Sequence, residues 1–130
     1  MKWLRRDAFI LPIYFGLATD AKKLKKELNR MKVPDSVKIG VNAGYGATTS
    51  FLTNGEGDTC AIVCIFDYSK KDYNQIAALL VHEAVHIWQE TKKIMGEESP
   101  SKEFEAYTIQ SISQKLFYEF AAQTKTGIKK

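Results

Sequence analysis

The sequence is poor in cysteine, proline and histidine, and no stretch of it is apolar for long. Its 130 residues contain two cysteines, three prolines and two histidines. A membrane-spanning helix needs about 20 consecutive apolar residues, so none is expected. Hydrophobic residues nevertheless make up 45% of the chain, enough to bury a core, which excludes a disordered polypeptide. Because no internal repeat divides the chain, residues 1–130 are predicted to form a single compact domain.

The two cysteines are placed so that they cannot form a disulfide with each other. Cys60 and Cys64 are four positions apart in a segment predicted to be a strand. At about 3.3 Å per residue their Cα atoms would lie roughly 13 Å apart, well beyond disulfide geometry. We therefore expect two free thiols in the core, which suits a reducing compartment and predicts a cytoplasmic protein.

The N-terminal segment leaves secretion as an alternative. Basic residues within 1–6 precede a mostly apolar segment, 8–18, in the order of a short signal peptide, with residues 16–18 as a cleavage site. Asp7 and Pro12 interrupt that pattern. We expect residues 8–18 to belong to the fold and to pack as an irregular or short helical segment.

Much of the formal charge of +4 comes from clustered lysines. They are Lys22, Lys23, Lys25, Lys26, Lys125, Lys129 and Lys130. No aromatic or glycine-rich binding pattern accompanies them, so a solvated surface is the first interpretation. A nucleic-acid binder is a hypothesis that a steep salt dependence of binding would support.

The centre of the chain has the pattern of a small sheet. Residues 20–32 carry apolar side chains every three or four positions, which predicts a helix that Pro34 ends. Strands are predicted at 37–43, 48–53 and 59–66, with a turn at 54–58. The last strand is apolar throughout and is expected inside the sheet. Residues 48–53 are the better edge strand, where an extended peptide can pair.

Two helices are predicted after the strands. The first begins at Ser69, with Asp72 completing a capping box, and runs to about Ile94, where Gly96 would end it. The second begins near residues 99–100, a serine followed by proline. This order predicts an α+β domain in which a small, mainly antiparallel sheet packs against both helices.

Both histidines of the chain belong to one motif, His-Glu-Ala-Val-His at 82–86. Positions i and i+4 share a face of a helix, so His82 and His86 can reach one metal ion. Glu83 lies about 100° around the helix and can face a water molecule on that metal. Zinc lowers the pKa of such a water to roughly 7, and a nearby carboxylate can accept its proton. The motif therefore predicts a zinc-dependent hydrolase.

A third zinc ligand has to be a carboxylate, because the chain has no further histidine. The carboxylates close behind the motif helix are Glu97, Glu98, Glu103 and Glu105. Glu103 and Glu105 differ by roughly 200° around a helix, so only one of them can point at the ion. Gln89 shares the face of the histidines and is a candidate partner for one of them.

The motif and residues 102–107, Lys-Glu-Phe-Glu-Ala-Tyr, together resemble the gluzincin metallopeptidases. HtpX-like peptidases and ImmA/IrrE-like proteins carry a glutamate ligand on their second helix, in an E-x-x-A-D or E-x-x-A-N setting. The resemblance implies that Glu103 is the third zinc ligand and that Ala106 is the small packing residue. Tyr107 stands where the family has Asp or Asn, which implies a catalytic phenol that binds a ligand or stabilises an oxyanion.

That resemblance covers residues 76–112, under a third of the chain. The chain as a whole is also similar to small zincin-like proteins of bacteriophages and prophages, which would place it in the host cytoplasm.

The motif and the resemblance lead to two candidate functions. The first is a metallopeptidase that cleaves a peptide or amide bond with Glu83 as general base. The alternative is a non-catalytic or weakly catalytic zinc-containing regulatory protein that acts through a protein partner. A carboxylate beside a metal with three protein ligands favours catalysis, since structural zinc sites usually have four.

Overall fold

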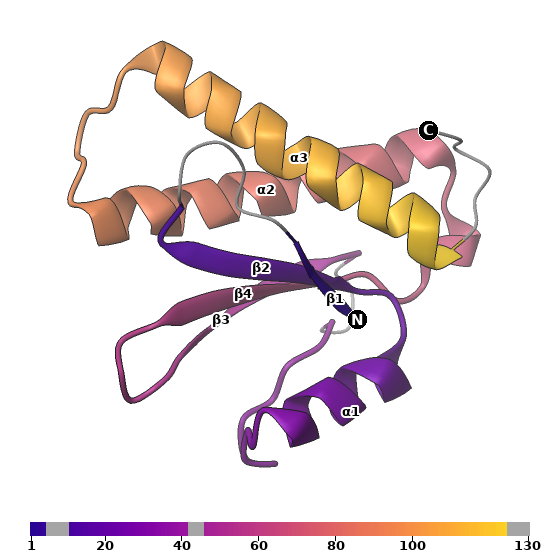
Figure 1. The fold of residues 1–130 in the computed structure, drawn as a ribbon. Coiled ribbons are helices and arrows are strands. Elements are labelled where there is room, and N and C mark those ends of the chain that lie inside the picture. The colour runs from indigo at the N-terminus through magenta and orange to yellow at the C-terminus, as the bar shows by residue number, and fades with distance from the viewer. Residues whose placement is uncertain (5–10, 42–45, 125–130) are drawn as a thin grey trace.

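The computed structural model describes residues 1–4, 11–41 and 46–124 and shows an α+β fold, as predicted. A sheet lies between one short helix and a pair of long helices (Figure 1). In chain order the elements are β1 (Lys2–Leu4), β2 (Ile13–Ala18), α1 (Ala21–Arg30), β3 (Thr48–Thr53), β4 (Thr59–Cys64), a 3-10 turn η1 (Tyr68–Lys70), α2 (Tyr73–Met95) and α3 (Lys102–Thr124).

The sheet is mixed, with strand order β1-β2-β4-β3 among the described residues. The central strands β2 and β4 are parallel, with Ile13 opposite Thr59, and the two outer pairings are antiparallel. A parallel pair needs a crossover, and here the chain returns through α1 on one face of the sheet. The predicted interior position of β4 and edge position of β3 are both confirmed.

Two predictions about the strands are wrong. Ile13–Ala18 is a central strand and not an irregular or helical segment, whereas residues 8–10 lie outside the described part. Every residue of β2 except Tyr14 is buried, so the strand lacks the alternation that marks a half-buried strand. Residues 37–41 form no strand, and 42–43 lie outside the described residues. There Ile39 and Val41 cover the α1 side of the sheet instead of pairing with it.

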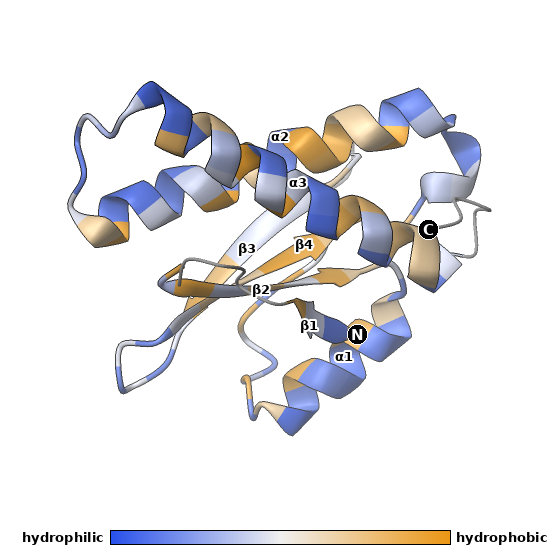
Figure 2. Ribbon diagram, turned by 45° about the horizontal axis from the view of Figure 1, so that its top comes forward, coloured by the Kyte–Doolittle hydropathy of each residue, from blue (hydrophilic) through white to orange (hydrophobic). Residues whose placement is uncertain are grey.

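The core has two parts, one on each face of the sheet. The larger lies under α2 and α3 and includes Ile13, Phe15, Leu17, Val63, Ile65, Leu80, Ile87, Ile112 and Leu116, all at most 1% exposed. The smaller lies under α1 and includes Leu24, Ile62 and Cys64. Figure 2 shows β4 as strongly hydrophobic between the helices, whereas α1 is largely hydrophilic. Both cysteines are free, as predicted, and burial raises the pKa of the Cys64 thiol to about 12.

The helix boundaries follow local capping chemistry. Asp20 caps α1. Gly96 ends α2 in a left-handed conformation, φ 71°, as predicted. The start of α2 differs, because Asp72 is its N-cap and exchanges hydrogen bonds with Gln75 in a capping box. Ser69 therefore lies in the preceding 3-10 turn. Similarly, α3 begins at Lys102, after Ser101 accepts a hydrogen bond from the Phe104 amide.

The structure shows no helix, within residues 1–4, 11–41 and 46–124, that is both long and apolar enough to cross a membrane.

We expect the packing of α3 on the sheet to contribute strongly to stability. Leu116 is fully buried, and Leu116→Ala should lower the free energy of unfolding by about 2–5 kcal/mol because it leaves a cavity. Tyr118, on the same helix and 44% exposed, is the matched control, and Tyr118→Ala should have a much smaller effect. Urea denaturation measures both. Equal losses in the two variants would contradict this account of the core.

Candidate metal centre

The His-Glu-Ala-Val-His motif lies in the middle of α2 and brings its two imidazoles together. His82 and His86 are exposed, one helical turn apart on the same face. Their Nε2 atoms are 3.1 Å apart, and the rings meet edge to face with centroids 4.8 Å apart. The prediction that both histidines point at one place is confirmed.

The separation of the two Nε2 atoms suits a zinc ion. Zinc binds imidazole nitrogen at about 2.0–2.1 Å with tetrahedral angles, which places two ligand nitrogens about 3.3 Å apart. The observed distance of 3.1 Å is close to that spacing. Two neutral imidazoles can share one proton between these nitrogens, and a metal ion that replaces the proton needs little rearrangement of the side chains.

Gln89 lies within hydrogen-bonding distance of the His86 ring. Its Oε1 lies 3.1 Å from His86 Nδ1, one turn further along α2. When Nδ1–H donates to this amide oxygen, the lone pair of His86 is on Nε2, which faces His82. Metal-binding histidines commonly donate their second ring N–H to such a partner, which fixes the tautomer and the ring orientation. Gln89 therefore has the contact expected of a residue that supports the site.

Glu83 occupies a different environment from the histidines beside it. It is 3% exposed, and its Oε1 accepts a 2.8 Å hydrogen bond from Thr49 Oγ1 on β3. Buried carboxylates need such partners, because an unsatisfied charge in the interior is costly. Sequence reasoning missed Thr49, because a threonine on an edge strand gives no signal of which helix it faces.

His82 and Glu83 line one cleft between α2 and the chain that enters β3. The cleft has a volume of about 880 Å³. Its lining residues are Gly46, Ala47, Lys71, Gln75, Ala78, Leu79, His82 and Glu83. The cleft therefore brings the predicted general base and one predicted ligand to the same solvent-accessible space, beside the edge strand of the sheet.

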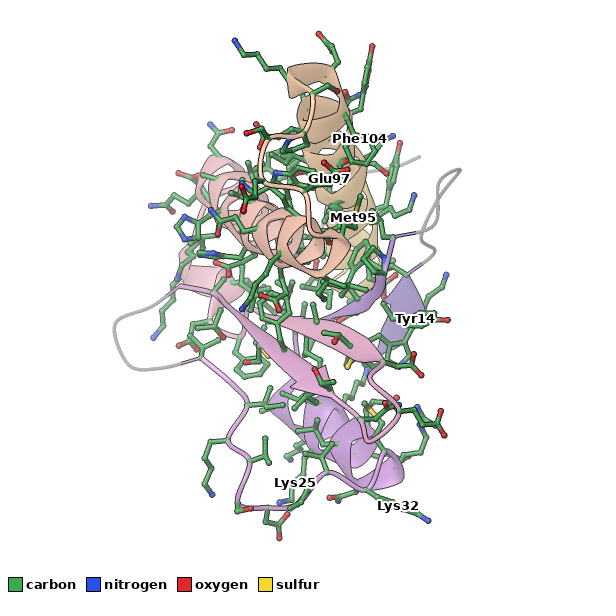
Figure 3. All side chains as sticks on the ribbon, turned by 90° about the vertical axis from the view of Figure 1, so that its left-hand side faces the viewer. Tyr14, Lys25, Lys32, Met95, Glu97 and Phe104 are labelled. Carbon is green, nitrogen blue, oxygen red and sulfur yellow. The ribbon has the colours of Figure 1, made fainter. Side chains whose placement is uncertain are left out.

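The second long helix packs on the other side of α2. Trp88 is 1% exposed and donates a 2.8 Å hydrogen bond to Glu105 Oε2, and its ring meets that of Phe104. Trp88 follows His86 by two positions, which is about 200° around the helix. Figure 3 shows Phe104 and Glu97 at the α2–α3 end of the molecule, opposite Lys25 and Lys32. The histidines thus point away from the helix that was expected to complete their site.

The structure does not bring the predicted third ligand to the histidines. Within residues 1–4, 11–41 and 46–124, no three His, Cys, Asp or Glu side chains are grouped as a metal site. Glu103 is exposed in the first turn of α3, and Glu105 is engaged by Trp88. Tyr107 is 62% exposed and does not line the cleft. The ligand role of Glu103 and the catalytic role of Tyr107 stay predictions that rest on the resemblance.

Comparisons of the chain with protein-family models, with curated proteins and with solved structures gave no match. The interpretation of the site therefore depends on its own residues and their geometry.

We expect the contact between Thr49 and Glu83 to stabilise the fold. Thr49→Val should lower the free energy of unfolding at neutral pH by about 1–3 kcal/mol, because it removes the partner of a buried carboxylate. Thr49→Ser keeps a hydroxyl group and should recover most of the loss. Chemical denaturation of the three proteins tests this. A valine variant as stable as the wild type would show that the hydrogen bond contributes nothing.

Proposed function

We propose that this protein is a zinc-dependent hydrolase, and specifically a metallopeptidase, with His82 and His86 as metal ligands and Glu83 as general base. The observation that carries the proposal is the 3.1 Å separation of the two Nε2 atoms, together with a cleft that both His82 and Glu83 line. Glu103 is proposed as the third ligand on the family resemblance alone.

Different residues of this chain would bind the metal and move the proton. His82 and His86 present their Nε2 atoms to one point, and Gln89 keeps the His86 ring in the tautomer that can bind a metal. A bound zinc ion supplies Lewis acidity, which activates water near neutral pH and polarises a carbonyl group.

Glu83 would move the proton. Its Oε1 is held by Thr49, which leaves Oε2 to accept the proton of the attacking water and to deliver it to the departing amine. The buried position of the side chain restricts its rotation, so the carboxylate is oriented before a substrate arrives. Such pre-organisation lowers the cost of reaching the reactive geometry.

The edge strand supports a peptide as the substrate. β3 pairs with β4 on one side only among the described strands, so its other edge carries free backbone groups. An extended peptide can pair with such an edge through main-chain hydrogen bonds. Because β3 also supplies Thr49 to Glu83, a peptide on this edge would run past the general base.

A zinc-containing regulatory protein is the second candidate. It is favoured by one observation, namely that Glu83 is buried and that its Oε1 already accepts a hydrogen bond from Thr49. In that case Glu83 would be a structural partner of Thr49, and zinc would serve to shape the surface that a partner protein contacts.

Zinc content is the first test. Untagged protein purified without chelator should hold one zinc ion per chain by elemental mass spectrometry, and His82→Ala and His86→Ala should lose it. The resemblance predicts loss in Glu103→Ala as well, whereas Glu105→Ala should keep zinc because Trp88 engages that carboxylate. Absence of zinc from the wild type after dialysis against it would overturn the proposal.

Catalysis is tested by replacing the general base. Zinc-loaded wild type should cleave members of a diverse fluorogenic peptide library, and Glu83→Gln should lower kcat by about 10²–10⁴-fold because it cannot accept a proton. Zinc content should not change. Glu56→Gln, at an exposed glutamate in the turn between β3 and β4, is the control and should keep full activity. A zinc-loaded wild type that cleaves nothing would favour the regulatory candidate.

A further inference from the structure

Among the residues that the structure describes, one lysine, Lys71, lines the cleft beside His82. This residue immediately precedes Asp72, the N-cap of α2, and its side chain is half-buried. Its Cε lies 3.3 Å from the point where a Cβ on Gly46 would be, and the Leu79 methyl groups lie 2.8 and 3.0 Å from the same point. The Lys71 stem therefore lies in the cleft against bare backbone, beside an apolar wall.

In the described part of the chain, Lys71 forms no ion pair with a carboxylate. The single ion pair recorded there joins Arg30 to Glu27, on the other side of the sheet. Among the described residues, Glu83 is the only acidic one that lines the cleft, and its partner is Thr49. A half-buried ammonium group that faces a cleft without an internal counter-ion is suited to bind an anion from outside.

The distance along α2 places this cation relative to the histidines. From Asp72 to His82 the helix rises about 15 Å, and a lysine stem spans roughly 6 Å of it. An anion on Lys71 would thus lie on the order of 10 Å from His82, the length of about three residues of extended chain.

The direction of β3 determines which end of a peptide would reach Lys71. Gly46 lies against Leu79, and Thr49 contacts Glu83, so β3 and α2 run in the same direction. Figure 1 also shows β3 and α2 running in the same direction. Antiparallel pairing is the more stable mode, and a peptide paired in that way would run from Thr53 toward Gly46. Its C-terminal side would therefore point to Lys71.

We propose that Lys71 is a specificity-determining residue that binds a substrate carboxylate about three residues to the C-terminal side of the cleaved bond. Either the free C-terminus of a peptide or an acidic side chain supplies this chemistry. The inference rests on the proposed function for the position of the bond, but the carboxylate site itself depends only on Lys71, Gly46 and Leu79.

The test measures binding and so does not need turnover. Three peptides, acetyl-Ala-Ala-Ala with a free carboxylate, its C-terminal amide, and acetyl-Ala-Ala-Asp amide, are titrated into ¹⁵N-labelled zinc-loaded Glu83→Gln protein. Shifts of the Gly46 and Leu79 amides report occupancy. The free carboxylate, the aspartate peptide or both should bind about fivefold more tightly than the neutral amide, which is the upper end for an ion pair open to solvent. The difference between the two acidic peptides identifies the source of the carboxylate.

Three further variants isolate the charge. Lys71→Gln should abolish the preference for carboxylate, Lys71→Arg should keep it, and Lys70→Gln, at the exposed neighbouring lysine, should leave it unchanged. Equal binding of all three peptides, or a preference that persists in Lys71→Gln, would overturn the inference. If the wild-type protein hydrolyses peptides without any carboxylate preference, the inference about Lys71 is overturned and the hydrolase proposal is unaffected. Carboxylate-dependent binding without hydrolysis of any peptide would support the Lys71 site and count against the hydrolase.

Discussion

The site depends on one buried carboxylate and the hydroxyl group that satisfies it. Glu83 is enclosed where α2 crosses the edge of the sheet, and Thr49 of β3 donates the hydrogen bond that makes this burial tolerable. That contact and the buried apolar face of α2 together set how the helix is rotated about its axis. Once Glu83 faces the sheet edge, helix geometry leaves His82 and His86 on the neighbouring, exposed side, where their Nε2 atoms meet.

The same rotation divides α2 into three faces with different partners. Leu80 and Ile87 pack on the sheet, and Trp88 faces α3, where Glu105 accepts its indole N–H. The histidines occupy the face that is left. This division explains why α3, although it follows α2 closely in the chain, does not present its carboxylates to the histidines: the bulk of Trp88 and the hydrogen bond to Glu105 hold it on the other side. The open face instead adjoins a cleft whose far end carries Lys71.

Several features were predictable because they depend on short-range chemistry. Asp20 and Gly96 act at helix ends through their own backbone and side-chain geometry. The strand at Thr59–Cys64 is apolar and β-branched, and the histidines are four residues apart on a helix, so neither depends on distant residues. Prediction failed where burial on both faces concealed the strand at Ile13–Ala18, since alternation is the usual signal of a strand. The position of the second helix relative to the histidines could not be predicted, because a sequence gives the order of two helices but not the angle at which one faces the other.

The amino-acid sequence alone therefore determined that His82 and His86 share one face of a helix and that Glu83 points to another, because spacing along one helix specifies direction through a fixed rise and rotation per residue. The tertiary structure decided what surrounds them: that Thr49 satisfies Glu83, that Glu105 serves Trp88, and that Lys71 lies in the cleft. Each of these contacts joins separate segments of the chain. The number of residues between two segments does not specify how they face each other, so only the packing of the helices on the sheet could establish these contacts.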